Sequence, residues 1–255
     1  HFGEIRRLTK IVKPNIAVIT NIGTSHIGNL GSRENILKAK LEILDGMEVP
    51  YLIINNDNDL LHNYYEENKE NITIKTFGIE NNSDANATNI KLNEYNSEFT
   101  CNIGESNFEV KVPVPGNHFV LNGLCAAIVG KTLELTNEEI KRGIEKFELT
   151  KKRMEITVLK DETKIINDSY NASFESMKAS IEYLGSMQNG RKIAVLGDMF
   201  ELGEYAVELH KKVGEEVAKN KIDILICAGE NAKYIYETAI KNGLTEENAY
   251  YWTTW

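Results

Sequence analysis

The chain has 255 residues, a formal net charge of -9, and a hydrophobic fraction of 42%. This length suffices for about two domains with substantial cores, and the acidic balance argues against a nucleic-acid binder, which would carry a basic stripe. The three cysteines, Cys101, Cys125 and Cys227, lie far apart without a CxxC spacing, and no apolar run approaches the ~20 residues that span a bilayer. We therefore expect a cytoplasmic protein with reduced thiols and no inserted membrane segment.

The first part of the chain alternates strand-like apolar runs with helical segments. The expected strands are residues 15–20, 51–55 and 72–78, and the expected helices are residues 33–45 and 58–69. This order predicts βαβ units and a mostly parallel sheet. The polar, Asn-rich stretch 81–114 predicts a small antiparallel sheet, and two further helices are expected at 117–133 and 137–147.

The second part repeats the alternation. Strands are expected at 154–159, 163–168, 191–196 and 222–227, with helices at 175–186, 204–219 and 231–241. This spacing predicts a second, Rossmann-like α/β unit. We predict two domains, 1–149 and 150–255. Because the chain begins at His1 and stops just after a strand-like run, we expect the first domain to be incomplete at its N-terminus and the second at its C-terminus.

The expected helix at 33–45 places its two lysines in different environments. At 100° per residue, Lys40 falls in the middle of an apolar face, whereas Lys38 lies opposite with Glu34 and Glu42. A lysine on an apolar face must extend to solvent, pair with a carboxylate or lose its charge. Periodicity leaves these alternatives open, including a surface lysine at the edge of the helix.

His26 follows the expected strand 15–20, where the carboxyl ends of parallel strands line the ligand crevice of an α/β sheet. A lone histidine is more often structural or simply exposed. The following helix, which carries Lys40, favours a shared site. Magnesium prefers oxygen ligands to imidazole, and Lys40 could supply oxygens only after its amine adds carbon dioxide as a carbamate.

No phosphate-binding loop is evident in the chain. The sequence Gly130-Lys131-Thr132 would need a preceding strand and a glycine at position 125, which is Cys125 in an expected helix. His118 and Asn122 share one face at the start of that helix and could flank a planar base or form a capped surface turn.

Two strand ends of the second domain also carry polar groups. These are Asp168, Tyr170 and Asn171 in one loop, and Gly197, Asp198, Met199 and Glu201 in the other. Together with the His26 loop they make three polar strand ends, which suggests a ligand cleft.

These pieces, taken in order, resemble the Mur ligases, the ATP-dependent amide-forming enzymes of peptidoglycan and cell-wall synthesis. The matching stretches are HFGEI (1–5), TNIGTSHIGNLGSRENILKAKLEIL (20–44), PGNHFVLNGLCAA (115–127), RMEI (153–156), INDSYNASFESMKA (166–179) and IAVLGDMFELGE (193–204). DSYNA with LGDMFELG is most similar to the branch that adds D-Ala-D-Ala to UDP-N-acetylmuramoyl tripeptide. The resemblance implies a central ATPase domain and a Rossmann-like C-terminal domain, with the N-terminal domain and phosphate loop outside this chain. We therefore expect the chain alone to be inactive.

The resemblance also implies the ligands and the residues that hold them. ATP and Mg²⁺ are the expected cofactors, UDP-N-acetylmuramoyl tripeptide and D-Ala-D-Ala are the expected substrates, and a monomer is expected. His26 and carbamylated Lys40 match the family's catalytic metal ligands. The expected ATP-binding residues are His118, Asn122, Arg153, Asp168, Tyr170 and Asn171, and the expected substrate-binding residues are Thr24, Ser25, Asp198, Met199 and Glu201.

The sequence departs from the family pattern at two places. Ser173 and Phe174 replace the usual Asn-Pro after DSYNA, and Leu41 replaces the glycine after Lys40. These departures are family variations. Two alternatives to the resemblance stay open: a related ligase that makes folylpolyglutamate or another poly-amino-acid product, and a non-catalytic nucleotide-binding homologue.

Overall fold

The computed structural model describes residues 1–254, which divide into two compact units. The first unit comprises His1–Gly23 and Ser32–Glu148, and the second comprises Thr24–Gly31 and the chain from Leu149 onward. A short segment from the first third of the sequence is therefore part of the second unit. The predicted domains, 1–149 and 150–255, remain a proposal.

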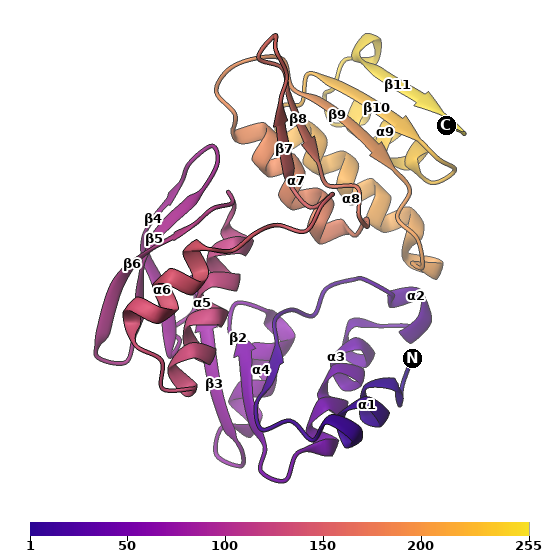
Figure 1. Ribbon diagram of the computed structural model, residues 1–255. Coiled ribbons are helices and arrows are strands. Elements are labelled where there is room, and N and C mark those ends of the chain that lie inside the picture. The colour runs from indigo at the N-terminus through magenta and orange to yellow at the C-terminus, as the bar shows by residue number, and fades with distance from the viewer. Residues whose placement is uncertain (255) are drawn as a thin grey trace. The chain divides into compact units, whose positions relative to one another are not determined.

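One six-stranded sheet forms the centre of the first unit (Figure 1). Its strands, in spatial order, are β1 (Ala17–Ile19), β2 (Tyr51–Asn55), β3 (Thr73–Gly78), β4 (Ala85–Leu92), β5 (Ser97–Ile103) and β6 (Ser106–Val112). The pairs from β1 to β4 are parallel, and those from β4 to β6 are antiparallel. The predicted α/β fold class is confirmed, and the antiparallel strands continue the parallel sheet.

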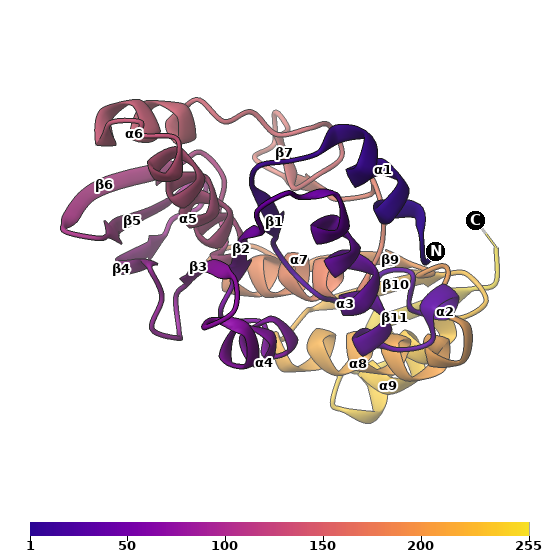
Figure 2. The ribbon, with the colours of Figure 1, turned by 90° about the horizontal axis from the view of Figure 1, so that it is seen from below.

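The helices of the first unit are α1 (Glu4–Val12), α3 (Arg33–Leu41), α4 (Asp59–Asn68), α5 (Asn117–Thr132) and α6 (Asn137–Glu145). Helices α3, α4 and α6 begin at side-chain caps, whereas α1 and α5 begin after a glycine. Ser32 accepts the N–H of Asn35, and Thr136 forms a reciprocal capping box with Glu139. The largely apolar α5 packs along the sheet (Figure 2). Its Leu124 is fully buried.

The helix that carries Lys40 is shorter than predicted. It ends at Leu41 and continues as the 3₁₀ turn η1 (Glu42–Gly46). Ile36, Ala39 and Glu42 are buried, whereas Lys40 is exposed. The prediction of a core-facing Lys40 is therefore wrong, because the buried residues of α3 are Ile36 and Ala39. The prediction of a solvated Glu42 is also wrong, because the 3₁₀ turn that begins there breaks the 100° period.

Glu42 is buried because its carboxylate accepts the backbone N–H groups at the start of α1. Its oxygens lie 2.8 and 2.9 Å from the nitrogen of Gly3 and 3.2 Å from that of Arg6. These are N–H groups that a helix cannot satisfy internally. Glu42, only 5% exposed, thereby anchors α1 to the end of α3.

A three-stranded parallel sheet forms the core of the second unit, in the order β11-β10-β9. Its elements are β9 (Ile193–Gly197), β10 (Ile224–Ala228), β11 (Ala249–Trp252), α7 (Phe174–Ser186), α8 (Ala206–Lys219) and α9 (Ala232–Lys241), with the 3₁₀ turns η2 (Gly203–Tyr205) and η3 (Glu246–Asn248). Helix α8 packs against both α7 and α9 (Figure 2). The Rossmann-like expectation is confirmed for this part.

Two predicted strands of the second unit lie outside that sheet. β7 (Glu155–Val158) and β8 (Lys164–Asn167) pair with each other as an antiparallel hairpin. Only five residues separate them, too few for the crossover that a parallel pair requires. The interpretation of these two strands as part of a doubly wound sheet is therefore wrong.

The three cysteines are free and buried, and burial raises the pKa of Cys101 to about 12, of Cys125 to about 11 and of Cys227 to about 12. Their thiols therefore stay protonated and unreactive at neutral pH. In residues 1–254, no helix combines the length and the apolar character needed to cross a membrane.

Candidate functional site

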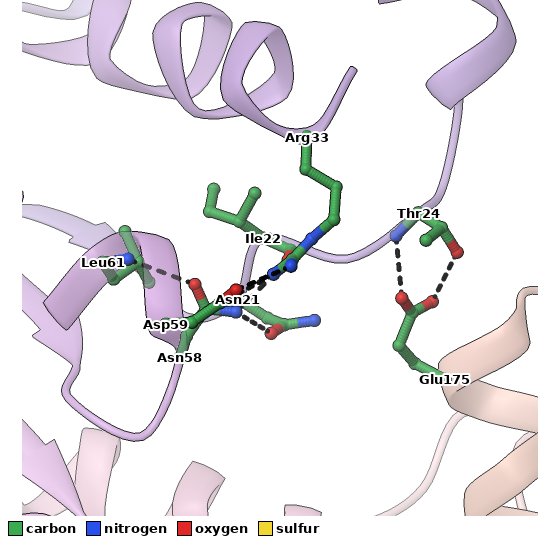
Figure 3. A network of polar contacts seen from close by, with 8 residues as sticks. All are labelled: Asn21, Ile22, Thr24, Arg33, Asn58, Asp59, Leu61 and Glu175. Carbon is green, nitrogen blue, oxygen red and sulfur yellow. Dashed lines mark hydrogen bonds and ion pairs between the residues drawn. The ribbon is translucent and has the colours of Figure 1, made fainter. Parts of the chain in front are cut away.

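The segment Thr24–Gly31 carries His26 and ends in the one-turn helix α2 (Ile27–Leu30). The backbone N–H and the hydroxyl of Thr24 both donate to the carboxylate of Glu175, at 2.8 and 3.0 Å (Figure 3). The Nδ1 atom of His26 contacts Oε2 of Glu201. The structure thus brings together His26 and Glu201, for which the sequence predicted separate metal and substrate roles. Ser25 is exposed.

Lys40 lies on the exposed side of α3. Its ammonium makes no hydrogen bond or ion pair with residues 1–254, so the amine is accessible for modification. Within the same described range, no group of three or more His, Cys, Asp and Glu side chains is close enough together to hold a metal ion. A magnesium site would therefore need oxygens from a modified Lys40 or from outside this set.

His118 and Asn122 lie at the start of α5, one turn apart. Asn122 is exposed and His118 is half-buried, with its ring centroid 4.2 Å from that of Phe119. Gly116, with φ of 124°, allows the imidazole to fold back, because a side chain there would lie 2.8 Å from the His118 ring. The pair offers an aromatic ring and an amide on one exposed face.

Arg153 and Tyr170 form a second exposed pair. The guanidinium lies over the phenol ring at 4.1 Å from its centroid, and Tyr170 donates its backbone N–H to the carbonyl of Lys152 at 3.0 Å. This stacking orients an exposed cation while leaving its N–H donors available for phosphate oxygens. Asn171, next along the chain, is also exposed.

Asp168 uses both carboxylate oxygens within the second unit. Oδ1 accepts the N–H of Met154 at 3.1 Å, and Oδ2 accepts the hydroxyl of Ser180 at 2.6 Å. The carboxylate thus ties the hairpin of β7 and β8 to helix α7. Its predicted contact with a ribose stays a prediction.

The loop after β9 holds its own residues in place. Oδ1 of Asp198 accepts the N–H groups of Asn231 and Ala232 at the start of α9, at 3.0 and 2.7 Å, while Met199 is only 2% exposed. Of the substrate-binding residues predicted in this loop, only the side chain of Glu201 is exposed, at 52%. The structure therefore gives Asp198 and Met199 architectural roles, and their contact with substrate stays untested.

His210 on α8 binds the backbone of this loop, a role that was not predicted from the sequence. It is fully buried, its Nε2 accepts the N–H of Met199 at 3.0 Å, and its Nδ1–H donates to the carbonyl of Ala206 at 2.6 Å. Burial lowers its pKa, so the ring is neutral. The signal was available, since His210 adjoins the apolar stripe of Leu209, Val213 and Val217. Glu175 lacked such a signal, because its partner is 151 residues away.

A separate groove of about 620 Å³ in the first unit contains none of the predicted site residues. It is lined by Lys75, Asp84 and Lys131, among others, and Lys75 pairs with Asp84 at 2.8 Å. The predicted site residues therefore lie outside this groove.

Comparison with known families covers nearly the whole chain. Residues 1–130 match the Mur ligase middle domain, and residues 152–255 match the Mur ligase, glutamate ligase domain. The chain belongs to the Mur ligase family. The expected family and fold class are therefore confirmed.

Individual Mur ligases are similar over the same range. The UDP-N-acetylmuramoyl-tripeptide--D-alanyl-D-alanine ligase of Bacillus subtilis is 37% identical, covering 94% of this chain and 51% of that protein. The Escherichia coli enzyme of the same name is 31% identical, covering 92% and 52%. The chain therefore spans about half the length of the curated relatives it matches.

Solved Mur ligase structures share the fold. MurF from Acinetobacter baumannii superimposes with a TM-score of 0.88 at 32% identity, over 98% of this chain and 53% of that one. MurF ligase from Thermotoga maritima, solved in complex with ADP, gives 0.81 at 25% identity, over 100% and 61%.

Proposed function

We propose that the protein containing this chain is an ATP-dependent ligase that adds D-Ala-D-Ala to UDP-N-acetylmuramoyl tripeptide. The observation that carries this proposal is the 37% identity to the Bacillus subtilis ligase of that name along 94% of the chain. The sequence identity to a folylpolyglutamate synthetase of known structure is only 14%, and that to a pseudomurein peptide ligase is only 21%. Neither supports more than a shared fold.

The proposed reaction has two steps. A carboxylate oxygen of the tripeptide attacks the γ-phosphorus of ATP, which releases ADP and leaves an acyl phosphate. The amine of D-Ala-D-Ala then attacks the acyl carbon, loses a proton and expels inorganic phosphate from a tetrahedral intermediate. Negative charge gathers where the two anions meet, so catalysis depends on cationic groups around the phosphates.

The exposed polar residues fit the nucleotide half of this reaction. We assign His118 and Asn122 to the adenine, the first by stacking and the second by hydrogen bonds. Arg153, oriented by the ring of Tyr170, is assigned to the phosphates because a guanidinium matches phosphate geometry. Asp168 and Asn171 are kept as candidates for the ribose and the neighbouring nucleotide contacts.

His26 and Lys40 are the proposed magnesium ligands, as the resemblance to the family implies. The Nε2 atom of His26 has no partner within residues 1–254 and Lys40 has an unpartnered amine, so the first could bind a metal directly and the second as a carbamate. Bound there, magnesium would neutralise phosphate charge. The proposed substrate-binding set remains Thr24, Ser25, Asp198, Met199 and Glu201; of the three that follow β9, Glu201 is the exposed one.

We also propose that the protein acts as a monomer in the cytoplasm. ATP and the nucleotide-linked precursor are available in that compartment, and the three buried free thiols suit its reducing conditions. Sedimentation of the protein from the complete gene would test the monomer, and fractionation of its host cells would test the location.

Phosphate release by the protein expressed from the complete gene tests the proposed reaction. With ATP, Mg²⁺ and UDP-N-acetylmuramoyl tripeptide, we expect release to depend on D-Ala-D-Ala, with D-Ala or L-Glu giving little turnover. Release that is independent of the dipeptide, or greater with glutamate, would overturn this substrate assignment. An absence of ATP turnover with every acceptor would favour the non-catalytic homologue.

A further inference from the structure

The Thr24–Gly31 segment is fastened to the second unit by two carboxylates. At the start of the segment, the carboxylate of Glu175 receives two hydrogen bonds from Thr24, which is only 8% exposed. Such a paired, charge-assisted contact fixes both the position and the direction of the backbone. Glu175 lies in the first turn of α7, shortly after the exposed residues Tyr170 and Asn171.

Glu201 fastens the remainder of the segment. Its Oε2 contacts Nδ1 of His26 and accepts from the side-chain amide of Asn29 at 3.2 Å, and its backbone carbonyl accepts the N–H of Gly28 at 2.9 Å. The hydroxyl of Tyr205 adds a hydrogen bond to the carbonyl of Gly31 at 2.7 Å. One glutamate thus contacts three residues of the segment.

The backbone conformation on both sides of this contact is unusual. His26 and Glu201 both have left-handed backbones, with φ of 62° and 59°, which few residues other than glycine adopt. Gly28 is pressed against the same loop, because a Cβ there would lie 2.6 Å from the nitrogen of Gly203. Such strain persists where the surrounding contacts dictate the conformation, and it concentrates at functional sites.

The side of the imidazole that Glu201 occupies determines what His26 can bind. A carboxylate accepts, so the proton of neutral His26 belongs on Nδ1, and the lone pair on Nε2 remains available. Histidines that bind metals commonly donate their second ring N–H to a carboxylate, which fixes both tautomer and ring orientation.

We propose that Glu175 and Glu201 are positioning residues that hold the Thr24–Gly31 segment, and that Glu201 orients His26 so that Nε2 can bind the metal. The second half of this inference rests on the proposed metal role of His26. Glu201 then has a role through His26 that does not depend on contact with the dipeptide. Glu175, to which the sequence assigned no role, holds the same segment.

Hydrogen exchange tests the fastening without any reference to catalysis. In the metal-free and nucleotide-free protein from the complete gene, Glu175→Ala removes the acceptor of the Thr24 amide and should speed its exchange about tenfold. Glu201→Ala keeps the backbone carbonyl that accepts from Gly28 but removes the contacts to His26 and Asn29, so it should speed exchange of the Gly28 amide by a smaller factor. Glu204→Ala is the matched control, since Glu204 is exposed in the same loop and has no polar contact within residues 1–254. Unchanged exchange in both variants would overturn the proposal.

Binding of Mn²⁺, a spectroscopic probe for Mg²⁺, tests the orientation of His26. Glu201→Ala should weaken binding about 10-fold to 100-fold, Glu201→Gln should recover part of the loss because its amide oxygen can still accept from Nδ1–H, and Glu204→Ala should match the wild type. Wild-type affinity in Glu201→Ala would overturn the role of Glu201. If His26→Ala also binds Mn²⁺ like the wild type, the metal role of His26 in the proposed function is wrong instead. Hydrogen exchange then still tests whether Glu175 and Glu201 hold the Thr24–Gly31 segment.

Discussion

Two neighbouring stretches of the chain are both held by glutamates, but in opposite ways. Ser32–Gly46 belongs to the first unit, and there the buried Glu42 receives three backbone hydrogen bonds. Thr24–Gly31 belongs to the second unit, and there Glu201 makes its contacts while 52% exposed.

Because Glu42 is buried and Glu201 is exposed, we expect their removal to have different effects. When a buried carboxylate is removed, the N–H groups it served lose their partner and water cannot easily replace it, so the folded state loses free energy. When an exposed carboxylate is removed, water takes its place, so geometry changes more than stability. Glu42 should therefore control folding and Glu201 the position of His26.

The largest effect is expected from Lys40, which lies in the stretch whose fold depends on Glu42. Lys40→Ala in the protein from the complete gene should lower ligase activity by about 100-fold or more, as expected when a charge-stabilising group at the reacting phosphates is lost. Added formate or acetate should partly restore activity by supplying oxygen ligands.

Lys38→Ala is the control, because Lys38 is also exposed on α3 and lies two residues away. We expect it to keep most of the activity. Full activity of Lys40→Ala in steady-state phosphate release would return Lys40 to the role of a surface lysine.

Glu42→Ala should give the largest loss of stability. The N–H groups of Gly3 and Arg6 lose their acceptor, so the free energy of unfolding should fall by about 2 kcal/mol. Urea denaturation measures this loss. Glu48→Ala, at an exposed position nearby, should change it by less than about 0.5 kcal/mol. Equal values for the two variants would contradict the contrast between buried and exposed carboxylates.

Acid should lower the stability of the second unit through His210. The pKa of His210 is lowered by burial, more than the carbonyl of Ala206 and nearby Asp198 raise it. The unfolded chain therefore binds the proton more readily, so the contribution of His210 to stability is complete above its unfolded pKa of about 6.5 and is lost as pH falls below that value.

The slope from this one residue cannot exceed about 1.4 kcal/mol per pH unit. Urea denaturation between pH 5 and pH 8 measures it. His210→Gln should be less stable at pH 8 and show a flatter profile between pH 6.5 and pH 5. An unchanged slope would show that His210 is not the titrating group.

The smallest effect is expected at the exposed ion pair between Arg33 and Asp59, within the first unit. Arg33 donates to both oxygens of Asp59, at 2.8 and 2.5 Å, and to the carbonyl of Ile22 at 2.8 Å (Figure 3). Asp59 is 62% exposed, so Asp59→Asn should cost only about 0.5 kcal/mol in urea denaturation at pH 7.

The hydrogen bond from Arg33 lowers the pKa of Asp59, so this small contribution should be present above pH ~4 and disappear in more acidic solution. Glu67→Gln, at an exposed position on α4, serves as the control. A loss of more than about 2 kcal/mol in the free energy of unfolding would mean that exposure does not determine how much these carboxylates contribute to stability.

Local pattern predicted the elements better than it predicted their environment. The expected helix 58–69 and strand 51–55 appear as α4 (Asp59–Asn68) and β2 (Tyr51–Asn55), because capping and apolar runs are local signals. The pairing of β7 with β8 and the burial of Glu42 were not predicted. Both depend on which partner the folded chain brings near, and Gly3 is 39 residues from Glu42.

The candidate site follows the same rule. The sequence predicted polar groups at strand ends and helix starts, and His118, Asn122 and Glu201 lie at such positions. It could not show that Asp168 and Asp198 already bond to neighbouring backbone, nor that Glu201 meets His26, 175 residues away in the chain.

The three thiols of this chain should not react with maleimide dyes at neutral pH, since each is buried and has a raised pKa. A cysteine placed at the exposed Ser25 would then be the site of this chain that accepts a fluorophore, without replacement of these three cysteines. Its anisotropy would report in real time when the neighbouring histidine is released from its glutamate.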